Sequence, residues 1–214
     1  MSPQAQRGDG LGDVSAHAGG GTTRQLALLL ALGGLVGLVS AVVLLVEKIA
    51  LIADPRYVPS CSINPVLSCG SVMTTPQAEA FGVPNPLIGV AGFAVVTTVG
   101  VGLLAGARYR RWFWLGLQAG VSLGAVFVHW LIFQSLYRIE ALCPYCIVVW
   151  IVTIALFWYT TLRNLTAAHA SLPRPTRRAT EVVAGYHGVV LTGWYLTILA
   201  LILFQFRTYW QTLL

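Results

Sequence analysis

Four cysteines, arranged in two pairs, are the residues of this sequence whose type and spacing could do chemistry. Cys143 and Cys146 form the motif CPYC directly before an apolar stretch, and Cys61 and Cys69 enclose a loop that contains the turn-favouring dipeptide Asn-Pro. Two nearby thiols can alternate between a dithiol and a disulfide by exchange with another thiol. We therefore interpret both pairs as redox-active.

The CPYC pair is predicted to lie at the N-terminus of a helix. Pro144 suits the first helical turn, and the apolar run begins just after the motif. At that end of a helix, free N–H groups and the helix dipole favour a thiolate, which we expect at Cys146. A loop of the size of Cys61–Cys69 closes as a disulfide without strain and opens without unfolding the protein, which suits a mobile electron shuttle.

Three other uses of the cysteines compete with this interpretation. A zinc site of four thiolates fits the CPYC half, but the loop pair exceeds the usual spacing of about two to four residues. Two structural disulfides are also open, although a CxxC disulfide closes too small a loop to stabilise a fold much. Haem attachment requires His after the second Cys, and residue 147 is Ile. We expect no bound metal, and a non-catalytic module held by zinc or disulfides stays an alternative.

Electrons collected by the cysteines need an acceptor. The sequence contains no GxGxxG or Walker motif for a nucleotide and no obvious ligands for haem or a metal cluster. A thiol pair at the point where a helix enters a membrane can reach a lipid-soluble oxidant, and a quinone fits this requirement.

The composition indicates a membrane protein. Hydrophobic residues make up 57% of the 214 residues and charged residues 9%, whereas soluble domains carry about 25% charged residues. The net charge of +6 comes from basic residues in short segments between apolar runs, which is typical of membrane topology. We therefore expect no nucleic-acid partner.

Five long charge-free segments predict an all-α membrane protein with five transmembrane helices. Each segment has the roughly 20 residues that a span needs, and none shows the alternation of a barrel strand. The predicted spans cover about 25–46, 86–107, 112–137, 142–162 and 184–206. Residues 1–23 are polar and predict a disordered cytoplasmic tail before a single membrane domain, 24–209, whose longest loop, 47–85, holds the first cysteine pair.

Both cysteine pairs are predicted to face the same compartment, because two crossings separate their loops. Charge selects that compartment, since Lys and Arg concentrate on the cytoplasmic side. Nine basic residues lie on the side of the N-terminus and four on the side of the cysteines. We therefore expect a multi-pass protein of the cell inner or plasma membrane, with a cytoplasmic N-terminus and extracytoplasmic cysteines, where disulfides persist.

With these motifs placed, residues 25–206 resemble the bacterial branch of the vitamin K epoxide reductase family. The resemblance is carried by CSINPVLSC (61–69), Thr75, PNPLIG (84–89) and CPYC (143–146), and the stretch FVHWLIFQSLYRIEALCPYC (127–146) is similar to actinobacterial members. It implies four helices around a quinone, with a fifth beside them. Many bacterial relatives carry a thioredoxin-like domain after the fifth helix, and this sequence stops at Leu214.

The resemblance also implies an electron route. A partner's thiols reduce the loop disulfide at Cys61, Cys69 passes the electrons to Cys143, and Cys146 reduces the quinone, usually menaquinone in actinobacterial relatives. The implied enzyme is a quinone-dependent thiol-disulfide oxidoreductase that drives disulfide formation, and its implied partner is a separate DsbA-like thioredoxin-fold protein.

Three further residues take their expected roles from the same resemblance. Asn85 matches the Asn that hydrogen-bonds a quinone carbonyl, with a turn or helix cap as the alternative. Thr75 stands near the redox centre. Trp150 lies where vertebrate enzymes have Tyr, which favours plain quinone reduction over the alternative, quinone-epoxide reduction. His129 lies within the third span, where a neutral packing histidine is expected.

Overall fold

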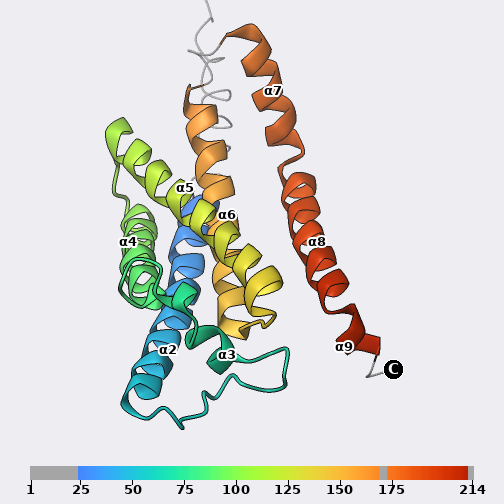
Figure 1. The fold of residues 1–214 in the computed structure, drawn as a ribbon. Helices are drawn as coiled ribbons and strands as arrows, with labels where there is room; N and C mark the ends of the chain where they lie inside the picture. The colour runs from blue at the N-terminus through green and yellow to red at the C-terminus, as the bar shows by residue number, and fades with distance from the viewer. Residues whose placement is uncertain (1–23, 169–172, 212–214) are drawn as a thin grey trace, which may run out of the picture.

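The structure is a computed structural model that describes residues 24–168 and 173–211, and in this part of the chain every regular element is a helix. Figure 1 shows long helices running side by side, with the loop that carries the first cysteine pair at one end. We call this end, which contains residues 54–84 and 140–143, the cysteine end. The predicted N-terminal tail, 1–23, lies outside the described residues.

The elements follow one another as helices of very different length. In chain order they are η1 (Leu29–Gly33), α2 (Gly34–Ala53), α3 (Cys69–Met73), η2 (Pro76–Glu79), α4 (Asn85–Leu104), α5 (Arg111–Gln134), η3 (Ser135–Ile139), α6 (Pro144–Ala168), α7 (Arg174–Gly185), α8 (His187–Gln205) and α9 (Arg207–Gln211). The segments η1 and η3 are π-helical and η2 is a 3-10 helix.

Five helices are long and apolar enough to cross a membrane, which confirms the predicted fold class. They cover Arg24–Ala53, Asn85–Leu104, Arg111–Ile139, Pro144–Ala168 and His187–Gln205. In a bilayer the backbone has no water to bond with, so an apolar run satisfies its own N–H and C=O groups by forming a helix. The protein is therefore an all-α, multi-pass membrane protein.

Four of the long helices form the bundle, in which α2 packs on α4, α5 on α6, and α2 on α6. One cluster of buried side chains joins all four helices. It contains Leu30, Ala41, Phe93, Val96, Val99, Trp114, Leu117, Val121 and Leu156. This cluster lies away from the cysteines and makes the bundle a rigid support for the loop at its end.

Glycines allow the first helix to approach α4 closely. A Cβ at Gly37 would meet the ring of Phe93, and one at Gly100 would meet the backbone of Leu30 and Ala31. Small residues at such positions let helix backbones come near each other, and this close packing holds membrane helices together.

Helix α8 stands beside the bundle rather than within it (Figure 1) and contributes no buried residue of its own. Partly buried Ile198 and Ile202 pack it against the cluster that contains Trp150, and hydrogen bonds attach it to α5 and α6. The Trp194 indole donates to Nε2 of His129 on α5 at 3.0 Å, and the Tyr195 hydroxyl donates to the Ile151 carbonyl on α6 at 2.8 Å. Because Nε2 accepts, Nδ1 of His129 carries the proton and donates to the Ala125 carbonyl, so this histidine is neutral.

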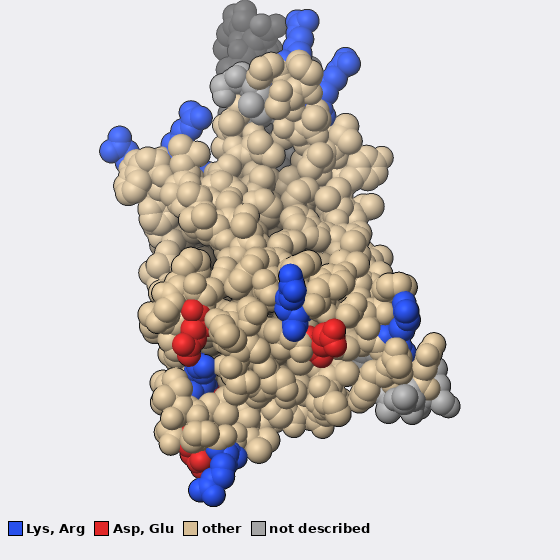
Figure 2. All heavy atoms as spheres, viewed as in Figure 1, with Lys and Arg blue, Asp and Glu red and all other residues tan. Residues whose placement is uncertain are grey.

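The two ends of the bundle differ in charge. On the face that Figure 2 shows, the acidic side chains lie in the half with the cysteine end, and the described residues at the opposite end show basic side chains alone. Arg108, Arg110 and Arg111 in the α4–α5 connection and Arg174, Arg177 and Arg178 on α7 belong to that opposite end. The basic residues thus gather where the charge count from the sequence places them.

The contact of Gly100 with the first helix gives a test of the packing. We expect Gly100→Ala to destabilise the bundle by about 1–3 kcal/mol, because the added methyl group meets backbone atoms that cannot move aside. Gly92→Ala is the matched control on the same helix, since its Cβ meets nothing within 4 Å. Thermal unfolding in detergent should show a lowered midpoint for Gly100→Ala alone, and equal midpoints for both variants would contradict the packing.

Candidate active site

A short backbone pairing joins the loop after α2 to the turn before α6. Leu67 and Leu142 form a parallel bridge, in which the Ser68 N–H donates to the Leu142 carbonyl at 2.9 Å and the Leu142 N–H donates to the Val66 carbonyl at 2.7 Å. Cys69 and Cys143 follow this bridge on their respective segments. The bridge therefore brings together the two cysteine pairs, which lie far apart in the sequence.

The loop folds locally because its polar side chains bond to its own backbone. Asn64 Oδ1 accepts from the N–H groups of Val66 and Leu67 at 3.0 and 2.7 Å, which closes the turn between the two cysteines. Ser68 caps α3 by accepting from the Ser71 N–H. Helix α3 then begins at Cys69 and ends at Met73, and η2 follows it after a break before Pro76.

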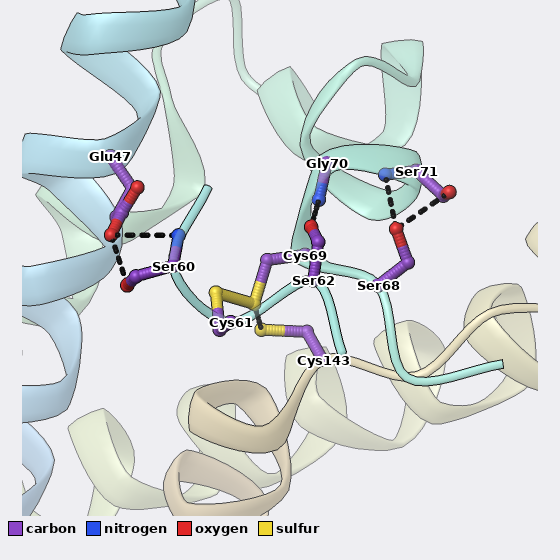
Figure 3. Close-up of a disulfide and its surroundings, with 9 residues drawn as sticks. All are labelled: Glu47, Ser60, Cys61, Ser62, Ser68, Cys69, Gly70, Ser71 and Cys143. Carbon is purple, nitrogen blue, oxygen red and sulfur yellow. Dashed lines mark hydrogen bonds between the residues drawn. A yellow bond between two sulfur atoms is a disulfide. The ribbon is translucent and has the colours of Figure 1, made fainter. Parts of the chain in front are cut away.

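Three sulfur atoms meet at the centre of the site (Figure 3). Cys61 and Cys69 form a disulfide, and the Sγ of Cys143 lies 3.0 Å from the Sγ of Cys69. All three cysteines are buried, with exposed fractions of 5%, 0% and 0% in sequence order. A sulfur in direct contact with a disulfide sulfur is placed for thiol–disulfide exchange.

Cys143 directly precedes α6, which begins at Pro144. The thiol of Cys146 donates a hydrogen bond to the Cys143 sulfur and lowers the pKa of Cys143, with the backbone N–H groups of Cys146 and Tyr145 acting in the same direction against the effect of burial. The sequence predicted the thiolate at Cys146, but the structure favours it at Cys143. The main reason is the hydrogen bond from the Cys146 thiol, and the start of α6 one residue after Cys143 adds free N–H groups that point at the same sulfur.

Cys146 lies one turn into α6 and is half-buried. It packs both against the cluster of Cys61, Cys69 and Cys143 and against a second cluster that contains Trp150. Trp150 follows Cys146 by four residues, hence on the same face of α6, and it is buried rather than exposed to lipid. Cys146 thus connects the sulfur cluster with the interior of the bundle.

Thr75 lies between α3 and η2, and Asn85 is the first residue of α4. Asn85 Nδ2 donates to the Gln77 carbonyl at 2.7 Å, and its Oδ1 accepts from the Ala80 N–H at 3.1 Å, so the amide holds η2 against the start of α4. The Thr75 hydroxyl donates to the Val72 carbonyl at 2.8 Å. Both side chains bond to nearby backbone in this state.

A comparison with protein families assigns this site. The model of the vitamin K epoxide reductase family matches residues 28–161, which include all four cysteines and four of the five spans. The chain belongs to the vitamin K epoxide reductase family. It is therefore an oxidoreductase of the membrane, of a family that links thiols to quinones or quinone epoxides. No curated protein matches the chain.

Two side chains of the cysteine end keep a group that a quinone, the acceptor of this family, could use. The Asn85 amide has two N–H donors, and a single one of them has an acceptor among the described residues. The half-buried thiol of Cys146 is less enclosed than the other three cysteines of the site. A quinone supplies a two-electron, two-proton acceptor when bound.

A metal centre fits the described state less well. The sulfur atoms of Cys61, Cys69 and Cys143 lie within 4.8 Å of one another, which is close enough for one ion. Two of the three belong to a disulfide, however, and zinc requires thiolates. The geometry of this state is that of exchanging sulfurs.

The roles of two charged residues in the structure differ from those that their positions in the sequence suggest. Glu47 and Lys48 end the first apolar run, a position that is typical of charged anchors at the membrane surface. In the structure α2 continues through them to Ala53, both side chains are buried, and both bond to the redox loop. No pattern in the sequence predicts these contacts, because they depend on how the loop folds back onto α2.

The hydrogen bond from Cys146 to Cys143 predicts a pH dependence. Because this bond lowers the pKa of Cys143, the thiolate persists at lower pH than for an ordinary thiol. Cys146→Ala removes the donor and Cys146→Ser keeps one. In both variants attack of Cys143 on Cys69 releases the Cys61 thiol, which a maleimide can label.

We expect the curve of labelling rate against pH to lie at higher pH for Cys146→Ala than for Cys146→Ser, since loss of the hydrogen bond from residue 146 removes the largest of the effects that lower the pKa of Cys143. Cys143→Ser is the control, in which the released thiol should not form. Identical curves for the alanine and serine variants would show that Cys146 does not control the Cys143 thiolate.

Proposed function

We propose that the protein reoxidises a DsbA-like thioredoxin-fold partner and passes the electrons through Cys61/Cys69 and Cys143/Cys146 to a quinone, with menaquinone as the expected species. The observation that carries this proposal is the contact of 3.0 Å between Cys143 Sγ and Cys69 Sγ. This contact joins a loop disulfide to a thiol pair at the N-terminus of a membrane-spanning helix. The result of the cycle is the formation of disulfides in other proteins.

The first exchange takes place at the loop. A thiolate of the reduced partner attacks Cys61 Sγ, the Cys61–Cys69 bond breaks, and Cys69 leaves as a thiolate. The partner's second thiol then attacks the mixed disulfide, which frees Cys61 as a thiol. The partner departs oxidised, and two electrons remain on the loop pair.

The second exchange moves these electrons inward. The Cys69 thiolate attacks Cys143 of a Cys143–Cys146 disulfide, and Cys146 leaves as a thiolate. Cys61 then attacks Cys69, restores the Cys61–Cys69 disulfide and releases Cys143. A thiol of low pKa is a good leaving group, so the lowered pKa of Cys143 favours this release.

The described state corresponds to the end of this second exchange. The loop pair is oxidised, and Cys143 and Cys146 are free thiols. The two electrons then lie on the Cys143/Cys146 pair, and we propose that Asn85, Thr75 and Trp150 line the quinone site together with Cys146. The Asn85 N–H is a neutral donor, which stabilises charge that develops on a carbonyl oxygen during reduction.

We also propose that the cysteine end faces away from the cytoplasm. The described residues at the opposite end are mainly basic, which is typical of the cytoplasmic side. A compartment that maintains disulfides lies outside it. After reduction, a membrane-impermeant maleimide added to intact cells should label Cys61 but not a cysteine placed in the α4–α5 connection by Arg108→Cys; the reverse pattern would overturn this orientation.

Quinone reduction by the purified protein tests the enzymatic role. With dithiothreitol as electron donor and menaquinone as acceptor, the intact protein should form quinol, and Cys146→Ala should reduce the rate at least about 100-fold, because the thiol next to the acceptor is lost. Thr98→Ala is the control, since this hydroxyl bonds within α4 alone. Full-rate reduction by Cys146→Ala would contradict the proposed relay.

The same assay separates quinone reduction from the epoxide alternative. Because Trp150 has no hydroxyl to donate, we expect turnover of the quinone and much slower turnover of its epoxide. Comparable turnover of both substrates would assign the protein to epoxide chemistry instead.

A further inference from the structure

The described state hides the disulfide that a partner must attack. Cys61 is 5% exposed and Cys69 is fully buried. A protein partner needs direct contact between its thiolate and a disulfide sulfur, because exchange proceeds by attack on sulfur. The loop that carries Cys61 must therefore move before the partner can react, although Cys69 has to stay near Cys143.

Two consecutive residues of α2 hold the two ends of this loop. Glu47 accepts hydrogen bonds through Oε1 from both the hydroxyl and the backbone N–H of Ser60, the residue directly before Cys61 (Figure 3). Lys48 donates to the Met73 carbonyl at 2.7 Å and forms an ion pair with Glu79 at 2.9 Å. Met73 ends the short helix that Cys69 begins.

Because the side chains of Glu47 and Lys48 are buried, their contacts strongly favour one position of the loop. Both side chains are buried at the end of an otherwise apolar helix. A buried charge without a partner is costly, so each of the two charges favours the loop conformation that supplies its partners. Glu47 selects the conformation of the Cys61 arm of the loop, and Lys48 selects that of the Cys69 arm.

The two arms are attached unequally to the rest of the protein. The Cys69 arm is also held by the backbone bridge to Leu142. On the Cys61 arm, Tyr57, Val58 and Ile63 are exposed, and the Tyr57 hydroxyl donates a further hydrogen bond to Glu47. Release of Tyr57 and Ser60 from the single Glu47 side chain thus frees the Cys61 arm, whereas release of Cys69 would also break the backbone bridge.

We propose that Glu47 and Lys48 are positioning residues with opposite tasks in the thiol relay. Lys48 keeps Cys69 in contact with Cys143, and the Glu47–Ser60 contact is a latch that closes Cys61 off and opens to admit a thiol donor. The biological meaning of the latch rests on the proposed function. The contacts of Glu47 and Lys48 do not depend on that function. The role of each residue is therefore tested without a quinone and without the partner.

The latch is tested in a variant with Cys143→Ser and Cys146→Ser, where the Cys61–Cys69 disulfide is the one bond that can be reduced. The probe is dithiothreitol, and the readout is the rate at which thiols appear. Ser60→Ala and Glu47→Ala should each accelerate reduction roughly 10-fold, which is the scale of one hydrogen bond to a charged acceptor. Thr74→Ala, a loop hydroxyl with local bonds to Gly70 and Ser71, is the matched control and should leave the rate unchanged.

A rate for Ser60→Ala within twofold of the parent would overturn the latch. Ser60→Ala changes one hydroxyl near the surface, so this outcome is available even if Glu47→Ala fails to fold. The double variant Glu47→Ala/Ser60→Ala should react about as fast as Glu47→Ala alone, because the bond of the Ser60 hydroxyl is one of the contacts that Glu47→Ala already removes. A purely structural role for Glu47 predicts additive effects instead.

The task of Lys48 is tested in a variant with Cys61→Ala and Cys146→Ala, which keeps Cys69 and Cys143. Oxidised and reduced glutathione set the redox balance, and the readout is the equilibrium constant for closing the Cys69–Cys143 bond. Lys48→Met should lower this constant roughly 10-fold, Lys48→Arg should restore most of it, and Ser60→Ala should leave it unchanged. Glu79→Gln, which removes the ion pair but keeps the Met73 contact, should give an intermediate value.

An unchanged constant in Lys48→Met and in Glu79→Gln would overturn the assignment to Lys48. These results are independent of quinone turnover. If the glutathione and dithiothreitol experiments succeed and no quinone is reduced, the proposed function fails and the positioning stands. If quinone is reduced by the intact protein and both positioning experiments fail, the relay stands without these two residues.

Discussion

The contact between Cys143 and Cys69 is the constraint on which the site depends. Thiol–disulfide exchange requires sulfur atoms in direct contact, and these two cysteines are separated by 74 positions in the sequence. The backbone bridge between Leu67 and Leu142 meets this requirement. None of its hydrogen bonds involves a sulfur atom, so the bridge is compatible with every oxidation state of the four cysteines. The relay can therefore change its bonds while its scaffold keeps its shape.

This bridge is possible because the third span ends, and α6 begins, close to the loop. The third span ends in the π-helical segment η3, and Glu140 then adopts the left-handed conformation, which turns the chain back toward the loop. Three residues later α6 starts at Pro144, so the bridge, Cys143 and the free N–H groups of a helix follow one another within one short segment. The thiol that contacts the disulfide is thus the thiol whose thiolate the helix start helps to stabilise, and Cys146, three residues further, packs against the cluster that contains Trp150.

The sequence predicted the parts of this arrangement that local chemistry decides. Long charge-free runs form helices in a membrane regardless of their neighbours, and a CPYC motif before such a run lies at a helix start. The remainder depends on side-chain contacts that residue spacing does not determine. The Cys146 thiol donates to Cys143 and lowers its pKa, and the Asn85 amide bonds to η2. The Trp194 indole on α8 donates to His129 on α5, 65 positions away. For Glu47 and Lys48 the sequence predicted the usual role of charges at the end of a span, because their partners lie in a loop without periodicity.

The choice of charged residues at this end of α2 follows from what the loop has to do. Apolar side chains at these positions would hold the loop as firmly, and replacing a buried ion pair by apolar residues often costs no stability. Apolar contact is non-directional, however, and tolerates small displacements of the loop. A sulfur atom that must meet another needs its position defined more narrowly, and hydrogen bonds from Glu47 to Ser60 and from Lys48 to Met73 define direction as well as distance. Such bonds also break one at a time, since water can replace the partner of a carboxylate at the edge of the protein. A loop held in this way can release Cys61 and return it to the same place, which an electron relay with two exchanging partners requires.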